Sequence, residues 1–171
     1  MIVIVGGVAG SGKTTIGALL AGRMNWRFAD ADDFHPAANV TKMHTGVPLT
    51  DEDRWPWLRA IAAWMDARIA AGDSAVVTCS ALKRAYRDLL LDGRPSAWVV
   101  FLSVDRARLA DRLAIRGGHF FPRDLLDSQL AAVELPGPDE RAIVIEEREG
   151  PAATVEQIVS WLAEVPEARS G

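Results

Sequence analysis

Residues 7–14 read Gly-Val-Ala-Gly-Ser-Gly-Lys-Thr, a glycine-rich run that ends in a lysine and a threonine. The spacing matches the pattern G-x-x-x-x-G-K-[ST], in which glycines let the backbone turn its N–H groups inward around phosphate oxygens. Lys13 is expected to reach the β and γ phosphates of a nucleoside triphosphate, and Thr14 to offer its hydroxyl to Mg²⁺. An apolar run precedes the segment and a plausible helix follows it, which disfavours a chance glycine-rich turn. The predicted phosphate-binding residues are Gly7, Val8, Ala9, Gly10, Ser11, Gly12, Lys13, Thr14 and Thr15.

Two aspartates, Asp30 and Asp32, follow the second apolar run of the chain. The period of two in a strand would point both carboxylates the same way. Ligands of open α/β sheets bind at the carboxyl ends of strands, which is where this pair falls. One carboxylate would orient a metal-bound water, and the other would accept the proton of an attacking hydroxyl. Helix capping by Asp32 or Asp33 is the alternative that these residues leave open.

Side chains suited to an anionic acceptor occur further along the chain. Arg54, at the start of a predicted helix, is the best candidate for a carboxylate clamp because a guanidinium grips two oxygens at once. Lys83 would lie in the first turn of a helix capped by Ser80, where the helix dipole disfavours a cation. That placement indicates either an anionic partner or a solvated lysine. His35 is either a structural hydrogen-bonding residue or a ligand of the acceptor.

Arg112 and Arg116 are spaced i, i+4 on one face of a helix that begins near Asp105. The pair Gly117-Gly118 follows directly. This arrangement suggests a mobile flap that brings positive charge to transferring phosphates. Surface ion pairs with neighbouring aspartates are the alternative.

The elements that must position these residues are short and regularly spaced. Apolar runs alternate with helical patterns at Ile2 to Val5, Trp26 to Ala29, Ala75 to Cys79, Trp98 to Leu102 and Ala142 to Ile145. That alternation predicts an α/β fold with a five-stranded parallel sheet and helices on both faces.

Two helices have a predicted N-terminus. Thr50 and Asp53 have the spacing of a capping box, which places Pro56 in a first turn, where a missing N–H costs little. Thr154 and Gln157 repeat the capping spacing at the last helix.

The composition limits the class of protein. The 171 residues are 49% hydrophobic and 25% charged, which indicates one soluble globular domain over residues 1–171. A net charge of −4 and scattered basic residues argue against a nucleic-acid surface. No apolar run approaches the roughly 18 residues of a membrane span. The single cysteine, Cys79, excludes an intramolecular disulfide and a cysteine-based zinc site, which suits a cytoplasmic protein.

Several longer patterns together cover nearly the whole chain. They are residues 7–15, the stretch Asp30-x-Asp32-x-x-His35-Pro36 continuing to Leu58, Cys79-Ser80-Ala81-Leu82-Lys83 with Tyr86-Arg87-Asp88, Arg112-x-x-x-Arg116-x-x-His119, and Leu126-x-Ser128-Gln129 with Glu134-x-Pro136. In these segments the chain resembles the gluconate kinase family (thermoresistant type) within the P-loop kinases. Residues 30–58 and 79–83 are far more specific than the P-loop, which many enzymes share. The departures, Ala31 for the common Gly and Val133 for the common Leu, touch no group that performs chemistry.

The resemblance implies ATP-dependent phosphorylation of D-gluconate at its 6-hydroxyl. It implies a fold similar to nucleoside monophosphate and shikimate kinases, a small lid over residues 116–124, and usually a homodimer. Catalytic roles would belong to Lys13, Asp32 and Arg116, with Asp32 accepting the proton of the hydroxyl.

Binding roles follow from the same resemblance. Thr14, and Asp30 through a water, would hold Mg²⁺. Nucleotide phosphates would also be bound by Arg112 and Arg116. The residues expected to bind the acceptor are Asp32, His35, Arg54, Lys83 and His119.

Two other classes stay open from sequence. Another small-molecule kinase of this architecture, acting on shikimate or a nucleoside monophosphate, would share the P-loop and the carboxylates. A nucleotide switch is a different class. It is disfavoured because Asn39-Val-Thr-Lys42 lacks the spacing of the guanine-reading motif Asn-Lys-x-Asp.

Overall fold

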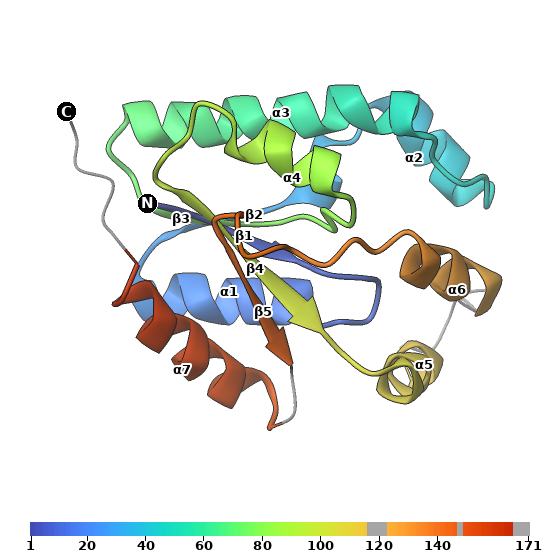
Figure 1. Cartoon of the computed structure of the whole chain (residues 1–171). Coiled ribbons are helices and arrows are strands. Elements are labelled where there is room, and N and C mark those ends of the chain that lie inside the picture. Colours follow the sequence, from blue (N-terminus) through green and yellow to red (C-terminus); the bar gives the residue numbers. More distant parts are fainter. Residues whose placement is uncertain (116–122, 147–148, 166–171) are drawn as a thin grey trace.

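The computed structural model describes residues 1–115, 123–146 and 149–165. Its strands are β1 (Ile2–Gly6), β2 (Arg27–Asp30), β3 (Ala75–Thr78), β4 (Ala97–Ser103) and β5 (Ala142–Glu146). All neighbours pair in parallel, in the order β2-β3-β1-β4-β5 (Figure 1). Each strand begins and ends within about one residue of a predicted apolar run, so the α/β class and the five-stranded parallel sheet are confirmed.

Helices cover both faces of this sheet. They are α1 (Lys13–Met24), α2 (Ala37–His44), α3 (Asp51–Ala70), α4 (Arg84–Leu91), α5 (Arg106–Ile115), α6 (Arg123–Ala131) and α7 (Pro151–Leu162), and a 3₁₀ turn, η1 (Ala31–Phe34), follows β2. In Figure 1, α1 and α7 lie on one face of the sheet, and α3 and α4 lie on the other. The short helices α5 and α6 stand beyond the carboxyl end of β4. In a parallel sheet that end is where the connecting segments form ligand sites.

The central strand β1 is buried on both faces. Ile2 and Ile4 pack into the core beneath α3 and α4, whereas Val3 and Val5 pack against α1 and α7. All four side chains are fully buried. Successive strand residues point to opposite faces, so an uninterrupted apolar run is what a central parallel strand requires. The P-loop therefore follows the most firmly held strand of the fold.

The start of α3 confirms one capping prediction and corrects another. The Asp53 N–H donates to Thr50 Oγ1 over 3.3 Å, and the Thr50 N–H donates to Asp53 Oδ2 over 2.9 Å, so the capping box is present. Because the helix begins at Asp51, Pro56 lies in its second turn, and the prediction of a first-turn proline is wrong. Without an N–H, Pro56 leaves the Glu52 carbonyl without its usual partner four residues later.

The start of α7 differs from its prediction. The helix begins at Pro151 after Gly150, because a proline at the first position lacks only an N–H that has no helical partner. Thr154 is already inside the helix, and its hydroxyl donates to the Gly150 carbonyl over 3.0 Å. Thr154 is therefore not the cap.

The predicted lid falls largely outside the described part of the chain. Of residues 116–124, only 123 and 124 are described, at the start of α6. Arg116 and His119 lie outside the described residues. Of the helices that the structure describes, not one combines the length and the apolar character that a bilayer span requires.

Candidate active site

The P-loop connects β1 to α1 in a backbone conformation that glycine alone adopts easily. Gly7, Gly10 and Gly12 have φ values of 137°, 80° and 90°. At Gly7 the space is also closed, because a β-carbon there would lie 2.7 Å from Ser11 Oγ and 2.8 Å from the Leu102 carbonyl oxygen. Side chains rarely tolerate either condition. The glycines are therefore required by the path of the loop.

The loop has the features of an anion site. No side chain caps the N-terminus of α1, and its first turn carries no acidic residue, so the positive end of the helix faces the loop. Ser11 is fully buried, and its hydroxyl has no hydrogen-bond partner. Lys13 Nζ donates to the Val8 carbonyl over 2.8 Å, across the mouth of the loop. These groups fit the phosphates of a nucleotide.

A side-chain hydrogen bond joins the P-loop to the end of β2. Thr14 Oγ1 donates to Asp30 Oδ2 over 2.9 Å. The other oxygen, Asp30 Oδ1, accepts the backbone N–H of Asp32 over 3.1 Å and so caps the turn η1. The strand ends at Asp30, so the period-two prediction for this pair is wrong, as is capping by Asp32 or Asp33. A 3₁₀ turn, rather than a strand, sets the two carboxylates near each other.

Asp32 has the electrostatic surroundings of a group that can take up a proton. Its side chain is 86% exposed, so a substrate can reach it. Desolvation by nearby protein atoms and the negative charge of Asp30 raise the pKa of Asp32, while the positive charge of Lys13 opposes the rise. A carboxylate with a raised pKa is a better proton acceptor than an ordinary one.

His35 is held in one orientation from two sides. Its ring stacks on Trp57 with centroids 4.4 Å apart and planes at 9°. Asn39 Nδ2 lies 3.4 Å from His35 Nδ1, and the same Nδ2 donates to the Asp53 carbonyl over 2.8 Å. An amide nitrogen can only donate, so Nδ1 accepts and Nε2 carries the proton. His35 Nε2 then faces Asp32 Oδ1 at 4.0 Å.

Burial keeps this imidazole neutral. Desolvation lowers the pKa of His35, Arg54 lowers it further, and Asp32 opposes both. Trp57 lies in the core, and its Nε1 donates to the Ala31 carbonyl over 2.6 Å. The stacking of His35 on Trp57 has no sequence signal, because the two residues are 22 positions apart in the chain. Asn39 likewise gained its role only from the fold.

A cationic cluster lies at the start of α3 and the start of α4. Lys83 Nζ binds both oxygens of Asp51, at 3.0 and 2.9 Å, and the Tyr86 hydroxyl donates to Asp51 Oδ1. Arg54 Nη1 lies 3.7 Å from Asp51 Oδ1 and 3.4 Å from the Tyr86 hydroxyl. Arg54 and Lys83, predicted separately, are thus brought together. We call Arg54, Lys83, Asp51 and Tyr86 the cationic cluster.

Mutual pairing changes the acid–base behaviour of this cluster. The Tyr86 and Lys83 hydrogen bonds lower the pKa of Asp51. The Asp51 carboxylate raises the pKa of Lys83, and burial together with Asp51 raises the pKa of Tyr86. Lys83 therefore stays charged and Asp51 stays ionised around neutral pH. Sequence reasoning missed Asp51 and Tyr86, because Asp51 sits where an acidic residue serves a helix start and Tyr86 reads as core.

Lys83 does not lie where the sequence predicted. It is the N-cap residue of α4, one position before the helix, and Ser80 does not cap this helix. The first free N–H, that of Arg84, is bound instead by Glu134 Oε2 over 2.7 Å. The anionic partner that the placement of Lys83 suggested is Asp51, within the chain itself.

The loop that carries Lys83 is held by a buried ion pair. Arg87 binds both carboxylate oxygens of Glu140, at 2.6 and 2.9 Å, and the two side chains are 0% and 2% exposed. The same guanidinium donates to the carbonyls of Ala81 and Leu82. Ala81 has a φ of 43°, a strained value for a residue with a β-carbon. Arg87 therefore stabilises the loop in the conformation that places Lys83 on Asp51.

Helix α5 lies against the P-loop. A β-carbon on Gly12 would lie 4.0 Å from Arg112 Nη1, and one on Gly10 would lie 3.1 Å from Leu113 Cγ. The structure thus places Arg112 beside the phosphate-binding segment. Cys79, by contrast, is buried in the core, which raises the pKa of its thiol to about 12 and leaves it inert as a nucleophile.

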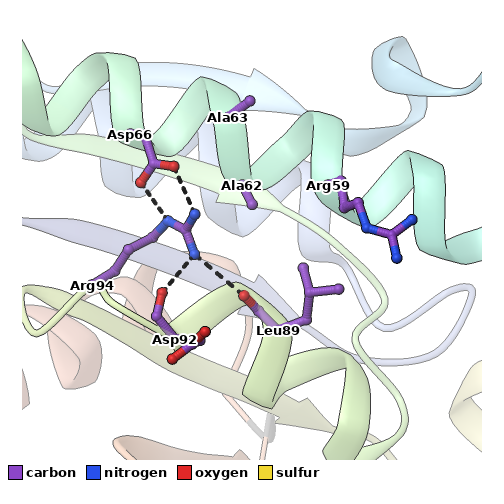
Figure 2. Close-up of a pocket in the computed structure, with 7 residues that line it drawn as sticks. All are labelled: Arg59, Ala62, Ala63, Asp66, Leu89, Asp92 and Arg94. Carbon is purple, nitrogen blue, oxygen red and sulfur yellow. Dashed lines mark hydrogen bonds and ion pairs between the residues drawn. The ribbon is translucent and has the colours of Figure 1, made fainter.

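A surface pocket lies away from the P-loop. Figure 2 shows a surface pocket of about 300 Å³ between α3 and α4. Arg94 spans it, with Nε and Nη2 each 2.7 Å from an oxygen of Asp66. The same guanidinium binds the carbonyls of Leu89 and Asp92. Arg94 therefore links α3 to the turn after α4. None of the residues that line this pocket belongs to the P-loop or to the cationic cluster.

A P-loop on the central strand of a five-stranded parallel sheet, with a carboxylate pair and a cationic cluster at the same edge, defines a P-loop kinase of small molecules. The family model described as shikimate kinase matches residues 9–163. A gluconokinase from Gluconobacter oxydans is 46% identical over 156 residues, which cover 91% of this chain and 88% of that protein.

Solved structures agree. A sugar kinase from Janibacter sp. superposes with a TM-score of 0.88 at 49% identity, over 96% of this chain and 95% of that one. A gluconokinase from Sinorhizobium meliloti gives a TM-score of 0.84 at 40% identity, over 94% and 90%. The chain belongs to the shikimate kinase family and, within it, to the gluconokinase branch.

Proposed function

We propose that this enzyme transfers the γ-phosphoryl group of ATP to the 6-hydroxyl of D-gluconate, giving 6-phosphogluconate and ADP. The observation that carries the proposal is the extent of its likeness to gluconokinases, 46% identity over 91% of the chain for the Gluconobacter oxydans enzyme. An alignment over 91% of the chain extends far beyond the P-loop, which many unrelated enzymes share.

The P-loop residues, Gly7 to Thr15, are assigned to the phosphates of ATP. Support comes from the uncapped start of α1, the orphaned Ser11 hydroxyl and the position of Lys13 across the loop. Mg²⁺, when bound, would neutralise charge on the phosphates. Thr14 and, through a water, Asp30 are the residues that would hold it, since magnesium sites usually combine one or two protein ligands with phosphate and water oxygens.

The charge of the cationic cluster favours a singly charged acceptor. Arg54 and Lys83 contribute two positive charges and Asp51 one negative charge, which leaves one positive charge at the site. A sugar acid carries a single carboxylate, whereas the phosphate of a nucleoside monophosphate carries about two negative charges at neutral pH. We assign Arg54 and Lys83 to the gluconate carboxylate on this basis.

The chemistry requires an oriented hydroxyl and a proton acceptor. Asp32 is assigned as the base, because it is accessible and its pKa is raised. His35, neutral and with Nε2–H toward Asp32, is assigned as a donor to an acceptor hydroxyl. Lys13, Arg112 and Arg116 are assigned to the charge that develops on the transferring group and on ADP. His119 is assigned to the acceptor from the family resemblance.

Three further assignments rest on the resemblance and on composition. They are a single domain over residues 1–171 with a lid over residues 116–124, a homodimer, and a cytoplasmic location. Light scattering of the purified enzyme tests the homodimer, for which the measured mass should be twice that of the chain.

Product analysis tests the reaction itself. The enzyme, incubated with ATP, Mg²⁺ and D-gluconate, is expected to give a phosphate monoester whose phosphorus couples to the protons on carbon 6 in NMR spectra. A phosphate on another carbon would mean that a different hydroxyl of gluconate faces Asp32. The absence of any phosphate ester would refute the proposal.

A further inference from the structure

A side chain of α6 holds the P-loop from outside. The backbone N–H of Ala9 donates to Gln129 Oε1 over 2.8 Å, a contact that joins residues 120 positions apart in the chain. Ala9 is the third residue of the P-loop. Its N–H is therefore turned toward α6.

The other side of the same peptide unit carries the P-loop lysine. The Val8 carbonyl accepts Lys13 Nζ over 2.8 Å and the Ser11 N–H over 3.2 Å. The peptide between Val8 and Ala9 is planar and trans, so its C=O and its N–H point in opposite directions. A bond to the N–H thus also sets the direction of the carbonyl on which Lys13 rests.

Helix α6, which carries Gln129, contacts both α5 and the core. Arg106 binds both oxygens of Asp127, with Nη2 at 2.7 and 3.0 Å, and so ties α5 to α6. Leu126 of α6 and Leu109 of α5 are buried in the same core cluster. The short pair of helices is therefore joined by an ion pair and by a shared apolar contact, and Gln129 is half-buried on the helix that these contacts hold.

From these contacts we propose that Gln129 is a positioning residue for Lys13, acting through the peptide between Val8 and Ala9. With Gln129 present, the carbonyl stays turned toward Lys13, and the ammonium group stays at the mouth of the loop. Without it, the peptide can rotate, which turns the Val8 carbonyl away from Lys13 and removes the acceptor that holds the ammonium group at the mouth of the loop. Nucleotide affinity should then fall.

The test is the substitution Gln129→Met, which keeps the length of the side chain and removes the strong acceptor. Calorimetry with MgADP and with a non-hydrolysable ATP analogue should show affinity reduced by roughly tenfold, the size of one lost hydrogen bond. The melting temperature should stay near that of the unmodified enzyme. Gln157→Met is the matched control, since Gln157 is an exposed glutamine on α7 and should leave affinity unchanged.

A double-mutant cycle separates this role from simple packing. If Gln129 acts through Lys13, then Gln129→Met should cost little further affinity in a Lys13→Met background. Full affinity in Gln129→Met, or a loss that is the same in both backgrounds, would overturn the proposal. The inference rests on the proposed function only in taking the P-loop to bind ATP. Binding is measured without an acceptor, so a failure to phosphorylate gluconate would leave this test intact.

Discussion

Thr14, in the helix that follows β1, and Asp30, the last residue of β2, are joined by a 2.9 Å hydrogen bond although the two strands do not pair. Strand β3 lies between β1 and β2, so the Asp30 side chain must reach across the end of β3 to the P-loop. This single contact connects the phosphate-binding segment to the turn that carries Asp32. The two residues assigned to Mg²⁺ are thereby held together, and the turn that Asp30 caps carries the proposed base.

The first prediction concerns Asp32. Asp32→Asn should lower kcat by about a hundredfold or more, because general-base catalysis contributes on that scale and an amide cannot accept the proton. Steady-state kinetics with ATP and gluconate measure it. The Michaelis constant for ATP should change little. Asp33→Asn is the control, since the neighbouring carboxylate is exposed and has no assigned role; near-normal turnover in Asp32→Asn would remove the base assignment.

The second prediction is a pH dependence. Asp32 must be ionised to act, so kcat/KM should fall as the pH drops through its pKa, which desolvation and Asp30 raise above the ordinary value of 3.8. Asp30→Asn removes the neighbouring negative charge, so the pKa of Asp32 should fall. The acid limb of the profile should then move to lower pH, even though the overall rate is reduced. An acid limb that stays in place would show that another group titrates.

The third prediction concerns the acceptor carboxylate. Arg54→Ala should raise the Michaelis constant for gluconate by roughly tenfold to a hundredfold, as expected for a hydrogen-bonded charge pair, and leave that for ATP nearly unchanged. Initial rates at varied gluconate and fixed, saturating ATP measure it. Arg59→Ala, an exposed arginine of the same helix, is the control. A change confined to the constant for ATP would place the carboxylate elsewhere.

The fourth prediction concerns the buried pair of Arg87 and Glu140. Glu140→Gln leaves the Arg87 cation buried without a counter-charge, which should cost about 3 kcal/mol of unfolding free energy at pH 7. Urea unfolding measures it. Glu156→Gln, in an exposed pair with Arg23, should cost less than about 1 kcal/mol.

The Arg87–Glu140 pair also predicts how the loss of unfolding free energy in Glu140→Gln depends on pH. Hydrogen bonds from Arg87 lower the pKa of Glu140 below its ordinary 4.5. Its contribution is therefore complete above pH 4.5 and is lost as the pH falls through the lowered pKa. The gap between the unmodified enzyme and Glu140→Gln should shrink below that pH. A gap that stays constant would mean that the charge of Glu140 is not what stabilises the fold.

The P-loop and the strands of the sheet could be predicted from the sequence because their signals are local. The P-loop is one contiguous pattern, and the strands are contiguous apolar runs, so neither depends on distant contacts. Helix starts were less reliable. At α4 the first free N–H is bound by Glu134 and not by Ser80, and Lys83 is the N-cap residue. At α7 the helix begins at Pro151, so Thr154 lies inside it and is not the cap.

The residues proposed to bind the phosphoryl acceptor could be predicted only in part. Arg54 and Lys83 were identified by charge, but Asp51 joins them only after α3 and α4 pack together. The contact between Gln129 and Ala9 spans 120 residues, and no local pattern encodes it. Such pairs depend on the tertiary structure, which periodicity does not describe.

The central claim is that a sugar acid receives the phosphoryl group, and ADP release tests it most directly. The enzyme with ATP and Mg²⁺ is assayed with D-gluconate, D-glucose, shikimate and AMP as acceptors. Glucose has the same terminal hydroxyl but no carboxylate, so it isolates recognition by the cationic cluster. The account predicts rapid ADP release with gluconate alone. Equal or faster release with shikimate, AMP or glucose would contradict it.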